Sequence, residues 1–179
     1  MMNFSTFRKL ISLLSFVIAG SLTGQAVIAQ TIFIVRHAEK TTSDNGLNMS
    51  RTDPPLTSAG EARARALLDS LRDDKIGYVF STPTARTRAT AEPTAHYFGL
   101  QPILYAAPDT AFISKLGSVD KNALVVGHSN TVDDIVNLLC GKEVVPEDLP
   151  DSSYDNLFVV TKKDNHWVFE NKKYGKKSR

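Results

Sequence analysis

Short apolar runs alternate with amphipathic segments along most of the chain. The runs are brief and rich in branched side chains, which is typical of buried strands. Four of them are predicted strands: 31–36 (TIFIVR), 78–80 (YVF), 102–104 (PIL) and 123–126 (ALVV). Each is followed by polar residues, so each predicted strand ends at a loop.

The segments between these runs predict helices. Ser58 and Glu61 have the spacing of a capping box, and apolar residues follow at helical intervals. A second helix is predicted after the turn at 81–83, where Pro93 is expected to interrupt it. A third, amphipathic helix is predicted from 131 to 139.

Two further apolar runs, 157–161 and 166–169, predict a hairpin with its turn at Asp164 and Asn165. No repeat, low-complexity tract or interdomain linker is visible in the sequence. Strands that alternate with helices predict a single α/β domain, a three-layer α/β/α sandwich with a mostly parallel central sheet. Ligands of such folds bind beyond the carboxyl ends of the strands.

The N-terminal segment has a different character. Arg8 and Lys9 precede an apolar run, and small residues occupy the positions before Gln30 that a signal peptidase reads. Polar residues keep the run shorter than the roughly 20 residues of a bilayer span. We expect residues 1–29 to be a signal peptide cleaved after Ala29, leaving residues 30–179 without a stable membrane span and in the periplasm or secreted.

Composition and charge narrow the classes of function. The chain has 21 Lys and Arg against 19 Asp and Glu, and the excess lies in the predicted signal peptide. Nothing in this balance indicates a nucleic-acid partner. Basic residues from Lys172 to Arg179 predict a solvated, frayed basic tail. Because Cys140 is the single cysteine, an internal disulfide is excluded. It lies in an apolar helical stretch and is interpreted as a packing residue.

Charged side chains follow three of the predicted strands. Arg36 and His37 come at the end of the first, Arg86 shortly after the second, and His128 directly after the fourth. The carboxyl ends of parallel strands meet at one edge, so we expect the four side chains to share a pocket. Arginine suits a tetrahedral oxyanion, and a neutral imidazole among such cations suits attack on phosphorus. The arrangement predicts phosphoryl transfer.

We expect neither a metal ion nor an organic cofactor. The sequence has no HExxH motif, and cations rather than carboxylates stand beside His37 and His128. The other two histidines, His96 and His166, have no partner motif and are assigned surface or packing roles. Four further arginines are interpreted as solvated helix faces: Arg63, Arg65, Arg72 and Arg88.

Four short motifs occur in order between about Thr31 and Thr161. They are Arg36-His37-Ala38-Glu39, Pro55-Leu56-Thr57-Ser58-Ala59-Gly60, Ser81-Thr82-Pro83 with Arg86, Thr90 and Ala91, and Gly127-His128. In identity and spacing they resemble the RHGE-like box, the PLTxxG box, the second arginine motif and the GH box of the histidine phosphatase superfamily. That group includes the cofactor-dependent phosphoglycerate mutases and many small bacterial phosphatases.

The resemblance implies that His37 becomes phosphorylated and that water then hydrolyses the phosphohistidine. It also implies that Arg36, Arg86 and His128 form the phosphate pocket. Glu39 is interpreted as orienting its loop rather than transferring protons. Asn130 either donates to a phosphate oxygen or caps the following helix, and both roles stay open.

One departure from the family concerns the proton donor. Ester-cleaving members carry a carboxylic acid between the second arginine motif and the GH box. This chain has no Glu there after Pro93; Asp109 is the best candidate and Asp120 the second. The alternative for Asp109 is the N-cap of a helix that begins near Ala111. Members without a clear acid handle substrates with better leaving groups, such as phosphohistidine.

The predicted function is a metal-independent phosphatase that acts on phosphate monoesters or phosphohistidine, carried by a small substrate or by a phosphoprotein. One alternative is a phosphoglycerate mutase-like phosphotransferase, which the compact chain and the expected export disfavour. The other is a catalytically silent phosphate-binding module. The sequence leaves the oligomeric state open.

Overall fold

The computed structural model describes residues 30–42, 53–164 and 166–178. The predicted signal peptide and its cleavage site lie outside these residues. Ten elements follow one another over the described ranges: β1 (Thr31–Arg36), α1 (Ser58–Leu71), β2 (Ile76–Ser81), α2 (Ala85–Tyr97), β3 (Ile103–Leu104), α3 (Thr110–Ser118), β4 (Asn122–Gly127), α4 (Val132–Cys140), β5 (Asn156–Lys163) and β6 (His166–Lys173).

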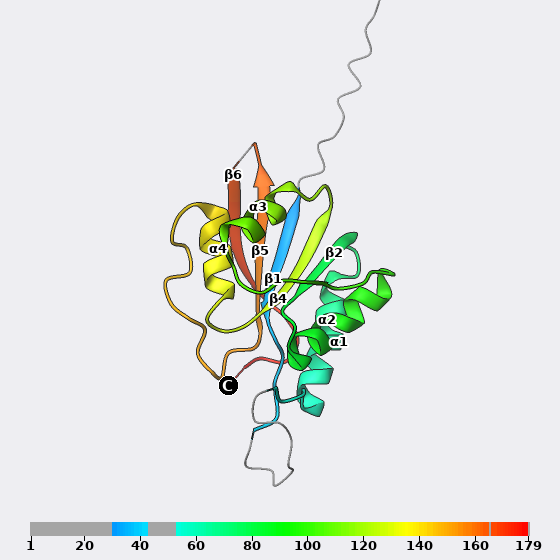
Figure 1. Cartoon of the computed structure of the whole chain (residues 1–179). Coiled ribbons are helices and arrows are strands. Elements are labelled where there is room, and N and C mark those ends of the chain that lie inside the picture. Colours follow the sequence, from blue (N-terminus) through cyan, green and yellow to red (C-terminus); the bar gives the residue numbers. More distant parts are fainter. Residues whose placement is uncertain (1–29, 43–52, 165, 179) are drawn as a thin grey trace, which may run out of the picture.

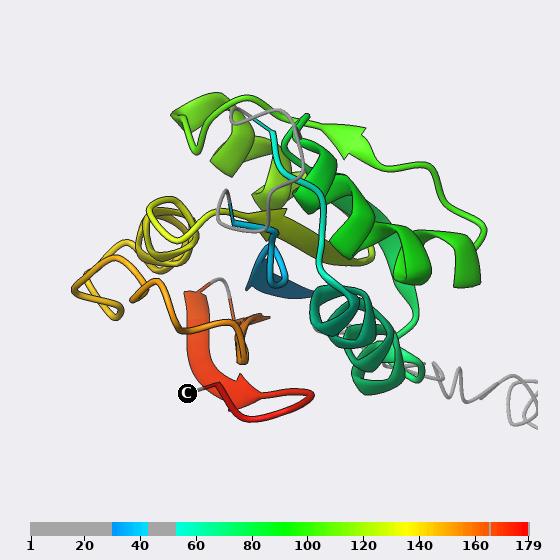
Figure 2. The same ribbon diagram turned by 90° about the horizontal axis from the view of Figure 1, so that it is seen from below.

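The strands form one mixed sheet in the order β3-β2-β4-β1-β5-β6. The first four are mutually parallel, whereas β5 pairs antiparallel with both β1 and β6. Helices cover both faces of the sheet, as Figures 1 and 2 show. The predicted three-layer α/β/α sandwich with a mostly parallel sheet is therefore confirmed.

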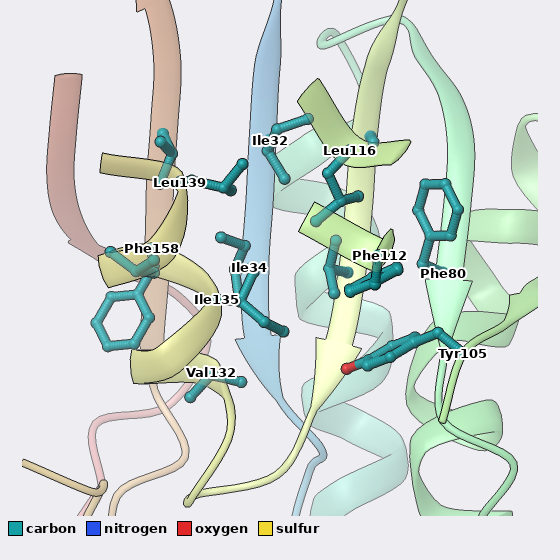
Figure 3. Packing of buried hydrophobic residues seen from close by; sticks show 14 residues of the cluster. Ile32, Ile34, Phe80, Tyr105, Phe112, Leu116, Val132, Ile135, Leu139 and Phe158 are labelled. Carbon is teal, nitrogen blue, oxygen red and sulfur yellow. The ribbon is translucent and has the colours of Figure 1, made fainter. Parts of the chain in front are cut away.

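Alternation along the strands divides the core between the two faces. In β1, Ile32 and Ile34 pack with the buried residues of α3 and α4 (Figure 3). Phe33 and Val35 point the other way and pack with α1 and α2. Each fully buried side chain of this kind contributes about 1.5–3 kcal/mol relative to exposure. Helices on both faces explain why residues 32–35 of β1 and 123–126 of β4 are apolar without interruption.

Helix α1 begins one residue earlier than the capping box predicted. Its N-cap is Thr57, whose hydroxyl accepts a hydrogen bond from the Gly60 N–H at 3.1 Å. The Thr57 N–H donates to the Glu39 carbonyl, which holds Thr57 in an extended conformation. This contact between distant segments explains why Thr57, and not Ser58, caps the helix.

Helix α2 does not stop at Pro93, contrary to the sequence prediction. It continues to Tyr97 with the proline inside it. Buried residues lie on both sides of the proline: Ala91 before it, and Thr94 and Ala95 after it. Ala91 and Ala95 pack in the same core cluster, and this contact stabilises the helix across the lost backbone hydrogen bond.

The predicted hairpin is confirmed, although Asn165 of its turn lies outside the described residues. The basic tail is solvated as predicted, but the prediction that it is frayed is wrong over residues 172–178. Strands β5 and β6 pair from Asn156 with Lys173 to Lys163 with His166. Lys173 bonds to the Asp155 carboxylate at 2.9 Å, and Tyr174 is buried. The tail lysines that the structure describes are exposed, but Lys172 and Lys173 belong to β6 and Lys176 and Lys177 to the segment after it. No helix in the described part of the chain is long and apolar enough to cross a membrane.

Candidate active site

The carboxyl ends of β1, β2 and β4 bring the predicted site residues together. The His37 N–H donates to the Gly127 carbonyl at 2.9 Å, which joins the end of β1 to the end of β4. The rings of His37 and His128 lie with their centroids 5.5 Å apart. Arg86, from the first turn of α2, approaches His128 with its Nη2 at 3.4 Å from Nδ1.

One nitrogen of the His37 imidazole is held by its own loop. Nδ1 lies 2.8 Å from the Ala38 carbonyl oxygen, which only accepts, so Nδ1 carries the proton and Nε2 has a free lone pair. Burial lowers the pKa of His37 to about 3; the Ala38 carbonyl opposes this shift, and the charges of Arg36 and Arg86 add to it. The ring is therefore neutral at physiological pH, as a nitrogen nucleophile must be.

His128 is fixed by bonds at both of its nitrogens. The Arg86 guanidinium only donates, so Nδ1 of His128 accepts and Nε2–H donates to the Thr82 hydroxyl at 2.9 Å. Burial lowers the pKa of His128 to about 4, and the Arg86 and Arg36 charges act in the same direction. The Asp53 carboxylate, 3.3 Å from Nη1 of Arg86, partly opposes them.

Arg36 and Arg86 each have one buried N–H donor that no described residue accepts from. Nε of Arg36 and Nε of Arg86 are buried and meet no hydrogen-bond acceptor among the described residues. A buried guanidinium N–H without an acceptor is costly, so such a group needs an explanation. Two guanidinium groups of this kind near a neutral imidazole have the chemistry that suits a tetrahedral oxyanion.

The loop that follows His37 is supported from behind by an ion pair. Arg63 donates from Nη2 and Nε to the Glu39 carboxylate at 2.7–2.9 Å. Although burial alone would raise it, these bonds hold the pKa of Glu39 below its usual range. At Gly60, an added Cβ would lie 2.3 Å from the Glu39 carbonyl oxygen, so α1 approaches this closely only because residue 60 is glycine.

The interpretation of Arg63 as a solvated residue is therefore wrong. It is only 5% exposed, whereas Arg65, Arg72 and Arg88 are exposed as predicted. The charge of Arg63 is tolerated inside because Glu39 and two backbone carbonyls accept from it. The structure is consistent with the orienting role expected for Glu39.

Three residues that the sequence reasoning did not assign to the site also lie in it. Thr82 orients His128, and Asp53 accepts from Arg86 and from the Ala85 N–H. Thr90 accepts from the Ala38 N–H and donates to the Arg86 carbonyl, which ties the first loop to α2. Thr82 and Thr90 belong to the second arginine motif, so the sequence could have indicated both as site residues. Asp53 lies outside the interval in which an acid was sought.

The predictions for Asp109 and Asn130 have different outcomes. Asp109 is exposed and is the N-cap of α3, where its carboxylate accepts from the Phe112 N–H at 2.8 Å. Its role as a proton donor stays a prediction. The N-cap of α4 is Thr131, so the capping alternative for Asn130 is wrong. Asn130 is exposed beside His128, and its contact with phosphate stays a prediction.

Within residues 30–42, 53–164 and 166–178, no group of three or more His, Cys, Asp or Glu side chains is arranged to hold a metal ion. The donors gathered around His37 are cationic or hydroxyl groups, which suit an anion.

A pH titration tests the electrostatics of the two histidines. Since both pKa values are lowered from 6.5, the unfolded chain binds more protons than the folded one from pH 6.5 down to about 3. The free energy of unfolding should therefore fall as the pH decreases through this window. NMR of the imidazole resonances should show His37 and His128 neutral at pH 5.5, and titration of both near pH 6.5 would contradict this account.

Comparisons with known proteins agree with the motifs and the fold. The sequence model of the histidine phosphatase superfamily (branch 1) matches residues 32–107. A protein named "Probable phosphoglycerate mutase GpmB" from Photorhabdus laumondii is 32% identical over 73 residues, which cover 41% of this chain and 34% of that protein. The chain thus matches about a third of the length of this curated relative.

Solved structures share the fold at low identity. The protein histidine phosphatase SixA complexed with tungstate has a TM-score of 0.58 at 22% identity, over 79% of this chain and 94% of SixA. Phosphoglycerate mutase from Bacillus anthracis has a TM-score of 0.61 at 14% identity, over 80% and 92%. Phosphoserine phosphatase from Entamoeba histolytica has a TM-score of 0.60 at 13% identity, over 83% and 98%. The family model thus confirms the predicted resemblance over residues 32–107, which contain the first three motifs, and the solved structures confirm the fold.

Proposed function

We propose that this chain, which carries the motifs and fold of the histidine phosphatase superfamily, is a phosphatase that forms a phosphohistidine on His37. The observation that carries the proposal is the state of the site. A neutral imidazole with a free Nε2 lies near two guanidinium groups, and each of these has a buried N–H that meets no acceptor among the described residues. These groups support a nucleophile and an oxyanion site at one sheet edge.

The reaction follows from these positions. His37 Nε2 attacks phosphorus while the bond from phosphorus to the leaving group breaks, and the electron pair of that bond goes to the leaving group. Arg36 and Arg86 hold the phosphoryl oxygens, and the bound dianion favours protonation of His128. Water then attacks the phosphohistidine, releases inorganic phosphate and returns His37 to its starting state.

The substrate is proposed to be a phosphate monoester or a phosphohistidine, on a small molecule or a phosphoprotein. The relatives bear names of both kinds, since SixA is named a protein histidine phosphatase and others are named for phosphoserine or phosphoglycerate. The only carboxylates that contact the pocket arginines over the described ranges are Asp53 and Asp151, and both are charge partners. A site with this composition favours leaving groups that need little protonation.

A phosphoglycerate mutase activity is the second candidate, because the curated relative carries that name. A mutase must transfer the phosphoryl group of His37 back to its product instead of to water. Incubation with a phosphoglycerate therefore distinguishes the two, since a phosphatase releases inorganic phosphate in step with substrate loss. Export to the periplasm or beyond remains part of the proposal, and N-terminal sequencing of the exported protein would test cleavage after Ala29.

The direct test is turnover of nitrophenyl phosphate by residues 30–179 in the presence of a chelator. We expect full activity in EDTA, because the residues proposed to act on phosphorus are a histidine and two arginines. Loss of activity in EDTA, restored by a divalent cation, would contradict the metal-independent mechanism. Phosphate binding without turnover would instead indicate a silent binding module.

The choice of leaving group distinguishes a proton-donor role of Asp109 from a role as N-cap alone. Asparagine caps helices as well as aspartate does, so Asp109→Asn removes the acid and retains the N-cap. If Asp109 is the proton donor that the sequence predicts, Asp109→Asn should slow hydrolysis of an alkyl phosphate far more than that of a nitrophenyl phosphate. Changes of less than about threefold on both esters would leave Asp109 only its N-cap bond to the Phe112 N–H. A loss of about 10²- to 10⁴-fold on the alkyl ester alone would establish Asp109 as the proton donor.

A further inference from the structure

The position of the Arg36 guanidinium is set by a loop far away in the sequence. Its Nη1 donates to the carbonyls of Pro150 at 2.8 Å, Asp151 at 3.2 Å and Ser153 at 3.3 Å. The side chain is 3% exposed, and its Nε is buried without an acceptor among the described residues. The Nη1 nitrogen is thus fully engaged by backbone, and the loop decides where the free Nε lies.

The face of the same guanidinium is covered by Tyr154. The Arg36 carbon Cζ lies 4.3 Å from the centroid of the Tyr154 ring, which is cation–π distance. The ring also lies 6.1 Å from the His37 ring. Tyr154 therefore flanks both the proposed nucleophile and one of its two arginines, and it contributes a π face.

Tyr154 is in turn held by the segment that follows β6, residues 174–178, which we name the strap. The Tyr154 N–H donates to the Ser178 hydroxyl at 2.8 Å. The Ser178 N–H donates to the Asp155 carboxylate at 3.0 Å, and the Tyr174 N–H donates to the Asp155 carbonyl at 3.0 Å. Residues 154 and 155 are thus bound at both ends of the strap, which lies at the carboxyl end of β1 (Figure 1).

The strap also contacts Arg63, which supports the loop after His37 through Glu39. Arg63, which holds Glu39, donates to the carbonyls of Tyr174 at 3.3 Å and Lys176 at 2.9 Å. Gly175 has a φ of +64°, and an added Cβ would meet the Ala66 Cβ at 3.3 Å and Arg63 Nη1 at 3.4 Å. Only glycine allows this turn so close to α1.

We propose that Tyr154 is a positioning residue for Arg36 and that the strap holds Tyr154 in place, so that the strap sets the affinity of the site for phosphate. This inference rests on the proposed function, because it treats Arg36 as a phosphate ligand. The strap contacts no phosphorus-bound atom in this scheme and acts through Tyr154 and Arg63. Its effect should therefore appear in phosphate affinity before it appears in the stability of the fold.

The test is the binding of inorganic phosphate to residues 30–179, measured by calorimetry. Tyr154→Ala should weaken binding by about tenfold, which is the expected loss of a partly desolvated cation–π contact. Tyr154→Phe keeps the ring and should bind within about twofold of the wild type. Tyr97→Ala is the matched control, since Arg72 lies 5.1 Å over its half-exposed ring at the end of α2.

The strap is tested by Ser178→Ala and its rescue. Loss of the acceptor for the Tyr154 N–H should weaken phosphate binding by about threefold, and Ser178→Thr, which keeps a hydroxyl, should restore it. If Tyr154→Ala does not fold, Tyr154→Leu replaces it, because leucine keeps apolar bulk but has no π face.

Each possible result either supports or contradicts the proposal. Wild-type affinity in Tyr154→Ala, or a Phe variant as weak as the Ala variant, would overturn the positioning role of the ring. Wild-type affinity in Ser178→Ala would overturn the role of the strap. A wild-type chain that binds no phosphate at all would instead contradict the proposed function.

Discussion

Substitution of His37 by alanine should reduce turnover of nitrophenyl phosphate by about 10⁴-fold or more. The reason is that the imidazole supplies the only nucleophile in the scheme, and removal of an attacking group leaves only binding and charge stabilisation. Steady-state rates of the purified variant check this expectation. Its affinity for inorganic phosphate should change far less than its rate, because Arg36 and Arg86 remain.

A matched control is available on α2. His96 is an exposed histidine of the same helix that carries Arg86, and His96→Ala should leave the rate unchanged. The His37 side chain is buried, so the melting temperature of His37→Ala must be measured beside the rate. A folded His37→Ala variant with undiminished turnover would remove His37 from the mechanism.

Arg86→Ala should lower kcat/KM by about 10²- to 10³-fold, comparable to the loss of one donor from an oxyanion site. In contrast to His37→Ala, it should also weaken the binding of phosphate and vanadate, because the guanidinium holds charge in the ground state as well as in the transition state. Inhibition constants for both anions, measured against nitrophenyl phosphate, give this readout.

Arg88→Ala is the control for charge, since Arg88 is an exposed cation two residues further along α2. Arg86→Lys should recover only part of the loss, because lysine lacks the planar fork that meets two oxygens at once. Unchanged anion inhibition in Arg86→Ala would mean that phosphate binds elsewhere.

The elements that could be predicted from the sequence are those with a strong local pattern. Residues 32–35 and 123–126 are apolar throughout because β1 and β4 are covered on both faces, and that burial is visible in the residues themselves. His37 and His128 follow these strands directly, so their placement at one edge followed from the parallel pairing. The second arginine motif likewise indicated that Arg86 follows β2 at the same edge.

What could not be predicted depends on contacts between distant segments. Arg63 has the helical spacing of a surface residue, and only the closeness of Glu39 and the strap makes its burial favourable. The lysines near the end of the chain have the composition of a frayed tail, but β6 continues to Lys173, which bonds to the distant Asp155. Pro93 lacks a backbone donor wherever it stands, and core packing on both sides of it decides that α2 continues.

The central claim is that a nitrogen of His37 carries the phosphoryl group during turnover. The most direct measurement is to quench the reaction with a labelled substrate and to test the phosphate on the chain for acid and base stability. We predict a phosphate that is labile in acid, stable in base and located by mass spectrometry on His37, with none trapped on His37→Ala. A phosphate that is stable in acid, or one located on another residue, would contradict the account.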